Sequence, residues 1–172
     1  MNKIKIALVT ALVVWALVSC GNKKENATDG ATAPTETETS TSATEEDTVS
    51  IEIESNDQMQ YSMKEIKVPV GKKVILTLRH VGKMPKEAMG HNWVLLKQGT
   101  DAKAFADEAS KAVATDYIPT TAAKDNIIAH TKLLGGGQAD RIEFTITEAG
   151  TYDFLCSYPA HFQAMNGKLI AE

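Results

Sequence analysis

Residues 152–165 read Tyr-Asp-Phe-Leu-Cys-Ser-Tyr-Pro-Ala-His-Phe-Gln-Ala-Met. At the start of this stretch every second residue is apolar, which predicts a strand whose buried face ends at Cys156. Pro159 then bends the chain, so that the following loop can return His161 and Met165 towards that cysteine. A rigid strand followed by a bent loop can therefore gather three sulfur- and nitrogen-bearing side chains at one point.

A second histidine lies far upstream, in residues 90–93, which read Gly-His-Asn-Trp. One thiolate, two imidazoles and a weak thioether form the ligand set of a mononuclear blue-copper centre for electron transfer. Cu(I) prefers soft sulfur and Cu(II) accepts imidazole, so this mixed set suits an ion that alternates between the two states. The sequence predicts one copper ion held by His91, Cys156 and His161, with Met165 as a weaker ligand.

Each candidate ligand has a simpler interpretation when it is taken alone. A buried cysteine or methionine often only fills a core, and a single histidine is more often structural than a ligand. Structural zinc sites seldom take methionine, and their cysteines and histidines are spaced differently. A thiol hydrolase with Cys156 as nucleophile and His161 as base is a further alternative, but nothing in the sequence marks an orienting carboxylate or an oxyanion site. The combined spacing favours copper.

The rest of the C-terminal part is rich in short strand-like segments separated by turn residues. The predicted strands are residues 49–54, 66–68, 74–78, 93–96, 126–134, 142–146, 152–156 and 169–171. Many short strands of this kind indicate a sandwich or a barrel. Residues 101–114 have apolar side chains at helical spacing, which predicts an inserted helix capped by Thr100.

The N-terminus carries a targeting signal rather than part of the fold. Lys3 and Lys5 precede an apolar run over residues 6–18 that is too short to span a membrane. We therefore predict a signal peptide over residues 1–19. The sequence Leu-Val-Ser-Cys that ends at Cys20 resembles a bacterial lipobox, in which the cysteine becomes the lipidated first residue. An ordinary signal peptide with an incidental cysteine is the alternative.

Residues 20–48 are dominated by Thr, Ser, Ala, Glu, Asp and Asn, and such a segment cannot bury enough apolar surface to fold. We predict a lipid-anchored disordered spacer followed by one domain at residues 49–172. The excess of acidic over basic residues that gives the net charge of −4 lies mainly in this spacer, which leaves the domain close to neutral. Nothing in the domain therefore indicates the basic face that nucleic-acid binding needs. Cys156 would be a lone thiol in an exported protein, which metal binding explains.

The domain closely resembles the azurins, a family of cupredoxins, from about Val49 to the C-terminus. The stretches that carry the resemblance are residues 56–60 (Asn-Asp-Gln-Met-Gln), 89–95 (Met-Gly-His-Asn-Trp-Val-Leu), 128–133 (Ile-Ala-His-Thr-Lys-Leu) and 156–165. The resemblance implies an all-β Greek-key β-sandwich of about eight strands with copper at one end. The expected helix falls where azurins carry their flap.

The resemblance also implies a role for each candidate ligand. His91, Cys156 and His161 would be equatorial ligands of the copper ion. Met165 would be an axial ligand, with the carbonyl oxygen of Gly90 on the opposite side. His161 would present its ring edge to solvent and pass electrons there.

Residues around the ligands would support the site and its contacts with partners. The backbone N–H groups of Asn92 and Tyr158 would donate hydrogen bonds to the thiolate and adjust the reduction potential. Met89, Ala160 and Phe162 would belong to an apolar docking patch around the exposed ligand.

The chain departs from the azurin pattern at several positions. Tyr158 stands where phenylalanine is usual, Ala160 stands where glycine is usual, and no cysteines are available for the usual disulfide. His80 matches a family histidine near the site, and His130 matches a surface position without an assigned role. Trp93 would lie in the core.

These features predict a copper protein that shuttles single electrons between redox partners in the periplasm or cell envelope. We expect no enzymatic activity, because such a protein converts no substrate. The resemblance suggests a c-type cytochrome or a copper-containing reductase as partner, and a lipid on Cys20 would hold the protein at a membrane. A copper carrier or buffer with the same ligands is the alternative. A shuttle is deep blue when it is oxidised, whereas a Cu(I) carrier is colourless.

Overall fold

The structure, a computed structural model, describes residues 47–172. The expected signal peptide, Cys20 and nearly all of the expected spacer lie outside these residues. Within them, no helix has the length and apolar character needed to cross a membrane.

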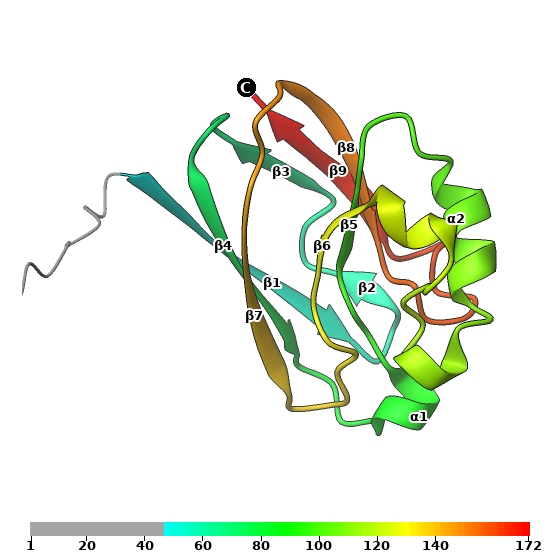
Figure 1. Cartoon of the computed structure of the whole chain (residues 1–172). Helices are drawn as coiled ribbons and strands as arrows, with labels where there is room; N and C mark the ends of the chain where they lie inside the picture. Colours follow the sequence, from blue (N-terminus) through cyan, green and yellow to red (C-terminus); the bar gives the residue numbers. More distant parts are fainter. Residues whose placement is uncertain (1–46) are drawn as a thin grey trace, which may run out of the picture. The chain divides into compact units, whose positions relative to one another are not determined.

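Two β-sheets face each other and form a sandwich (Figure 1). The first sheet has the strand order β2-β1-β4-β7, and the second has the order β3-β9-β8-β5-β6. The strands are β1 (Thr48–Asn56), β2 (Gln60–Tyr61), β3 (Glu65–Val68), β4 (Lys73–His80), β5 (Val94–Leu96), β6 (Ile127–His130), β7 (Ala139–Thr145), β8 (Gly150–Leu155) and β9 (Asn166–Ala171). The pairs β1–β4 and β3–β9 are parallel, and the others are antiparallel. Many neighbouring strands are not consecutive in the chain, as in Greek-key sandwiches.

This architecture confirms the expected all-β sandwich. The described residues form nine strands where about eight were expected, because residues 60–61 pair with the end of β1. A strand of two residues leaves no periodicity in the sequence. The strand expected at residues 126–134 is shorter, since the chain leaves β6 early and Leu134 forms an isolated bridge with His91.

The core lies between the two sheets and follows the alternation of apolar residues along the strands. Trp93 is fully buried, and its ring contacts Phe144 at a centroid distance of 5.8 Å and Phe154 at 5.4 Å. Its indole nitrogen is the one buried side-chain polar atom of residues 47–172 without a hydrogen-bond partner. Each large apolar side chain contributes about 1.5–3 kcal/mol when it is fully buried. The core therefore gives firm support to the loops at its ends.

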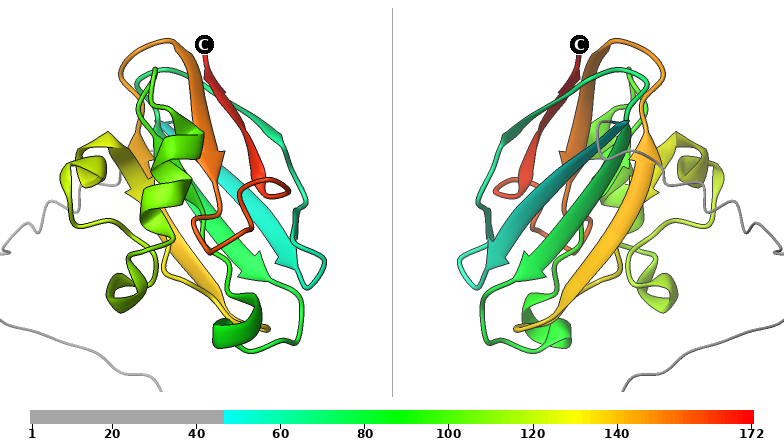
Figure 2. Two further views of the ribbon diagram at one scale, coloured as in Figure 1. Left: turned by 90° about the vertical axis from the view of Figure 1, so that its right-hand side faces the viewer. Right: turned by 90° about the vertical axis from the view of Figure 1, so that its left-hand side faces the viewer.

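The inserted helix, α2 (Ala102–Ala109), covers the outer face of the second sheet (Figure 2). Phe105 and Ala109 are buried there with Val94 of β5 and Leu155 of β8 in a second apolar cluster. The helix thus covers β5, which begins shortly after His91, and β8, which ends directly before Cys156.

Both ends of α2 differ from the expectation. The carboxylate of Asp101 caps the helix by accepting a hydrogen bond from the N–H of Ala104 at 3.0 Å. The expectation that Thr100 is the cap is wrong, because the helix begins one residue later. The helix stops near Ser110 rather than at residue 114, since the chain tightens there into turns that include the 3-10 helix η2 (Val113–Thr115).

Two further short helices connect the strands. Helix α1 (Lys86–Met89) directly precedes the candidate ligand segment at residues 90–91. Helix α1 was not expected from the sequence, because four residues are too few to show helical periodicity. The 3-10 helix η3 (Ala122–Asn126) leads into β6.

Candidate metal centre

The candidate ligands come from two distant parts of the chain and meet at one end of the sandwich. Cys156 directly follows β8, and the loop after it carries His161 and Met165 before β9 begins. His91 lies between α1 and β5 and exchanges two backbone hydrogen bonds of 3.0 and 2.8 Å with Leu134. Because β5 pairs with β8, the sheet itself brings the upstream histidine beside the cysteine.

Three donor atoms converge at this point. Nδ1 of His91 and Nδ1 of His161 are 3.2 Å apart, and Sγ of Cys156 lies 4.0 Å from the first and 3.7 Å from the second. A point equidistant from the corners of such a triangle is roughly 2 Å from each atom, which is the length of typical metal–nitrogen and metal–sulfur bonds. The three atoms can therefore surround one metal ion without a backbone rearrangement.

Both histidines are neutral at physiological pH and can act as ligands. Nε2 of His91 donates a hydrogen bond to the carbonyl of Asn56 at 2.9 Å, which leaves its Nδ1 with a free lone pair. Burial lowers the pKa of His91 and of His161 to about 4. His161 is only 4% exposed. Its Nε2 has no hydrogen-bond partner among the described residues and is not one of their fully buried atoms, so the ring edge keeps contact with solvent.

Cys156 is fully buried and has no disulfide partner among the described residues. Burial raises the pKa of its thiol to about 11, although the N–H groups of Asn92 and Tyr158 and the hydroxyl of Tyr61 act in the opposite direction. The metal-free protein therefore holds a protonated thiol at neutral pH. A bound metal ion would replace that proton, and the two N–H groups would then stabilise the thiolate.

The loop between the ligands is closed by its own backbone hydrogen bonds. The N–H of His161 donates to the carbonyl of Tyr158 at 3.1 Å, and the N–H of Met165 donates to the carbonyl of His161 at 2.8 Å. The N–H of Cys156 donates to the carbonyl of Met165 at 2.9 Å. Ala160 has a φ of 66°, a left-handed conformation that glycine adopts more easily. Met165 is fully buried and belongs to the same core cluster as Cys156.

Asn92 ties the two ligand-bearing segments together. Its side-chain amide donates to Oγ of Ser157 at 2.7 Å and accepts from the N–H of Ser157 at 2.9 Å. Each of these residues directly follows a candidate ligand, His91 in one segment and Cys156 in the other. From the sequence, only the backbone N–H of Asn92 was expected to contribute to the site. The sequence signal for the contact between Asn92 and Ser157 is that a polar residue directly follows His91 and another directly follows Cys156.

Gly90 allows the backbone to come close to the cysteine. Its carbonyl oxygen is 4.0 Å from Sγ of Cys156. A Cβ atom at this position would come within 2.6 Å of the carbonyl oxygen of Lys86 and within 3.0 Å of the side chains of Leu133 and Tyr158. Any larger residue would therefore push the carbonyl oxygen away from the metal site.

His80 supports the back of the site. Its ring stacks on the ring of His91 at a centroid distance of 4.5 Å. Nε2 of His80 donates to the carbonyl of Met89 at 2.9 Å, and Nδ1 accepts from the N–H of Gly82 at 3.1 Å. The carboxylate of Asp57 is 3.9 Å from the same Nε2. His80 is thus a positioning group rather than a ligand.

The residues expected to form a docking patch differ in exposure. Ala160 is exposed, whereas Met89 and Phe162 are half-buried. A small hollow of about 130 Å³ separates α2 from the ligand loop and is lined in part by Ala160, Phe162 and Tyr158. His130 lies outside the cluster of donor atoms, with Nδ1 bonded to the carbonyl of its neighbour Thr131.

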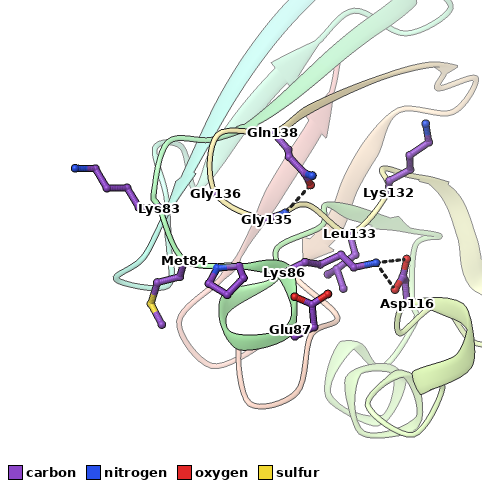
Figure 3. Close-up of a pocket in the computed structure, with 11 residues that line it drawn as sticks. Lys83, Met84, Lys86, Glu87, Asp116, Lys132, Leu133, Gly135, Gly136 and Gln138 are labelled. Carbon is purple, nitrogen blue, oxygen red and sulfur yellow. Dashed lines mark hydrogen bonds and ion pairs between the residues drawn. The ribbon is translucent and has the colours of Figure 1, made fainter.

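A larger hollow of about 530 Å³ is lined by the start of α1, by Asp116 and by residues of the 132–138 segment (Figure 3). Nζ of Lys86 lies between the two carboxylate oxygens of Asp116, at 3.1 and 3.2 Å. Lys83 and Met84 point away from the hollow. No cysteine or histidine lines it, so the metal chemistry belongs to the buried cluster instead.

The chemistry of the donor set agrees with copper. Among residues 47–172, the one group of at least three cysteine, histidine or carboxylate side chains able to hold a metal ion is His91, Cys156 and His161, and it contains no carboxylate. Magnesium and calcium need oxygen ligands, whereas a thiolate with two imidazoles in one plane is the equatorial set of a blue-copper site. The buried Met165 on the same loop could add the weak soft ligand that such sites use.

Comparison with known proteins identifies similar sequences. A family model described as copper-binding proteins of the plastocyanin/azurin family matches residues 47–172. The azurin of Achromobacter denitrificans is 43% identical over 121 residues, which cover 68% of this chain and 80% of that protein. Azurin-2 of Alcaligenes xylosoxydans xylosoxydans is 41% identical over 121 residues, which cover 68% and 92% of the two chains.

Solved structures show the same similarity at the level of the fold. Reduced auracyanin from the photosynthetic bacterium Roseiflexus castenholzii is 37% identical and has a TM-score of 0.64, with 72% of this chain and 96% of that chain covered. The azurin Az-iso2 of Methylomonas sp. strain J is 34% identical and has a TM-score of 0.62, with 72% and 97% covered.

Proposed function

The chain belongs to the plastocyanin/azurin family of copper-binding proteins, and we propose that His91, Cys156 and His161 are the equatorial ligands of its copper ion. It is a blue-copper electron-transfer protein with a site for a single copper. We assign Met165 as one axial ligand and the carbonyl oxygen of Gly90 as the other. The observation that carries this assignment is the convergence of the three donor atoms, within 4.0 Å of one another.

The protein's part in electron transfer is to keep the ligands still. Copper supplies a centre that takes up and releases one electron. Contacts outside the metal hold the ligand-bearing segments. Nε2 of His91 bonds to Asn56, Cys156 directly follows β8, and the loop after Cys156 is bonded to the side chain of Asn92. Ligands that are fixed in this way move little when the charge of the metal changes, and a small rearrangement favours fast electron transfer.

Electrons enter and leave, in this proposal, through the ring edge of His161. That edge keeps contact with solvent, whereas the other ligands are fully buried. Met89, Ala160 and Phe162 would form the apolar patch on which a partner docks. The chain exchanges electrons with redox proteins, and we propose a c-type cytochrome or a copper-containing reductase among them.

We place the domain in the bacterial cell envelope, with residues 1–19 as signal peptide and a lipid on Cys20. Residues 20–48 would serve as a disordered spacer between the membrane and the domain at residues 49–172. The composition of the N-terminus supports this proposal. We further propose that the protein converts no substrate, and its membership of a family of copper-binding electron-transfer proteins supports this.

The test is the visible spectrum of the copper-loaded, oxidised protein. We expect an intense blue colour from charge transfer between thiolate and Cu(II), reversibly bleached by a reductant. Cys156→Ser is expected to abolish this band, whereas Cys20→Ser, which removes the only other cysteine, is expected to keep it. Retention of the band in Cys156→Ser would remove Cys156 from the site. A colourless protein that gives up Cu(I) to a chaperone would instead be a copper carrier.

A further inference from the structure

A tyrosine hydroxyl joins the two ligand-bearing segments outside the metal site. Oη of Tyr158 donates a hydrogen bond to the carbonyl of Glu87 at 2.6 Å. Tyr158 lies two residues after Cys156, and Glu87 lies in α1, three residues before Gly90. The bond therefore connects segments that are 71 residues apart in the sequence.

The bonded carbonyl has no partner of its own within α1. The last carbonyl groups of a helix have no N–H partner inside that helix and need another donor. In α1 the N–H groups of Ala88 and Met89 both donate to Pro85, which leaves the carbonyl of Glu87 to the tyrosine. The end of α1 that leads into the metal site is thus held on one side by Tyr158 and on the other by His80, through Met89.

The ring of Tyr158 also contacts ligand residues directly. A Cβ atom at Gly90 would come within 3.0 Å of Cδ2 of Tyr158, so the ring covers the glycine whose carbonyl faces the metal site. The same ring packs against the ring of His161 at a centroid distance of 4.6 Å. Tyr117 contacts the ring edge-on from outside, at 5.0 Å.

We propose that Tyr158 is a positioning residue that clamps α1 to the ligand loop and so fixes Gly90 and His91 relative to Cys156 and His161. The inference rests on the proposed copper site and deepens it. A phenylalanine at this position would have no hydroxyl and could not make this bond. The clamp reduces the movement of the ligands that accompanies each change in the charge of the metal.

The test compares Tyr158→Phe with a matched variant, Tyr152→Phe. The hydroxyl of Tyr152 donates to the carbonyl of Glu148 at 2.7 Å, near the start of the same strand whose end leads to Cys156. Each variant keeps its aromatic ring and loses one hydrogen bond from a hydroxyl to a backbone carbonyl. The two therefore differ in whether the lost bond lies beside the metal site.

The first measurement is amide hydrogen exchange in the metal-free protein. In Tyr158→Phe we expect the amides of Met89 and His91 to exchange roughly two- to tenfold faster, which corresponds to the loss of one ordinary hydrogen bond. In Tyr152→Phe these amides are expected to keep the rate of the unmodified protein. Equal rates in all three proteins would overturn the proposal.

The second measurement is electron self-exchange between the oxidised and reduced copper-loaded proteins. We expect it to slow roughly two- to tenfold in Tyr158→Phe and to stay unchanged in Tyr152→Phe. If Tyr158→Phe speeds up amide hydrogen exchange but leaves the electron self-exchange rate unaltered, the hydrogen bond contributes only to structure, and the proposed role is overturned. If the unmodified protein takes up no copper, the proposed function fails, while faster amide exchange in Tyr158→Phe still supports the clamp.

Discussion

Met165 combines complete burial with a weak donor atom. We expect Met165→Gln to keep the copper but to lower the reduction potential, because an amide oxygen favours Cu(II) over Cu(I). The shift should be on the order of 60 mV, which corresponds to a tenfold change in the relative affinity for the two oxidation states.

Voltammetry measures this shift directly. Met63→Gln is the matched control, since Met63 is 42% exposed and lies outside the ligand loop. The control should retain the potential of the unmodified protein. An unchanged or higher potential in Met165→Gln would argue against an axial role for this methionine.

At the level of single residues, the ligands could be predicted because three of the four lie within ten residues. Cys156, His161 and Met165 form a local pattern whose chemistry is readable without the fold. The contact between Asn92 and Ser157 could not be predicted, because it forms only when segments 65 residues apart meet. The hydrogen bond from the hydroxyl of Tyr158 has the same tertiary origin.

At the level of elements, the cap of α2 offers a test of a local contribution to stability. Asp101→Ala removes the carboxylate that accepts the N–H of Ala104, and we expect it to lower the free energy of unfolding by about 1 kcal/mol. Thr100→Ala is the matched control and should cost little, since Thr100 makes no cap bond.

Urea unfolding of the domain measures both variants. The blue absorption should stay unchanged in each, because α2 carries no ligand. Equal losses of stability in the two variants would contradict the assignment of Asp101 as the cap.

The strands could be predicted more reliably than the helices. In β4 and β8 apolar residues alternate, and the buried faces follow that alternation. Helix α1 could not be predicted, since its four residues depend on bonds to Tyr158 and His80 rather than on local periodicity. β6 also ends earlier than expected, at His130, and the following residues pair again only at the isolated antiparallel bridge between Leu134 and His91.

At the level of the whole molecule, the ligands make the stability of the metal-free domain depend on pH. The pKa of His91 and His161 is about 4 in the folded protein and about 6.5 in an unfolded chain. The unfolded chain therefore binds more protons as the pH falls below about 6.5, and stability is lost between there and pH 4.

Cys156 has the opposite effect on the alkaline side. Its pKa is about 11 in the folded protein and about 8.5 in an unfolded chain. The unfolded chain loses a proton first as the pH rises above about 8.5, so stability is lost between there and pH 11. We expect the melting temperature of the metal-free domain to be highest between about pH 7 and 8.

Thermal unfolding across this pH range checks the expectation. The copper-loaded protein is the comparison, because a bound metal keeps protons off its ligands. Its melting temperature should lose the decrease above about pH 8.5 and should fall more steeply on the acid side, where protons compete with the metal for His91, His161 and Cys156. Parallel profiles for the two forms would show that the ligands do not control the pH dependence.

The unpartnered indole of Trp93 gives the domain an optical reporter. It is the only tryptophan in residues 47–172, and its surroundings hold no hydrogen-bond partner for its nitrogen. Few polar groups near the indole can reorient when it is excited. Its fluorescence emission is therefore expected at the short-wavelength end of the tryptophan range. Water that reaches the ring on unfolding moves the emission to longer wavelengths. One intrinsic chromophore thus follows the integrity of the whole interior without any label.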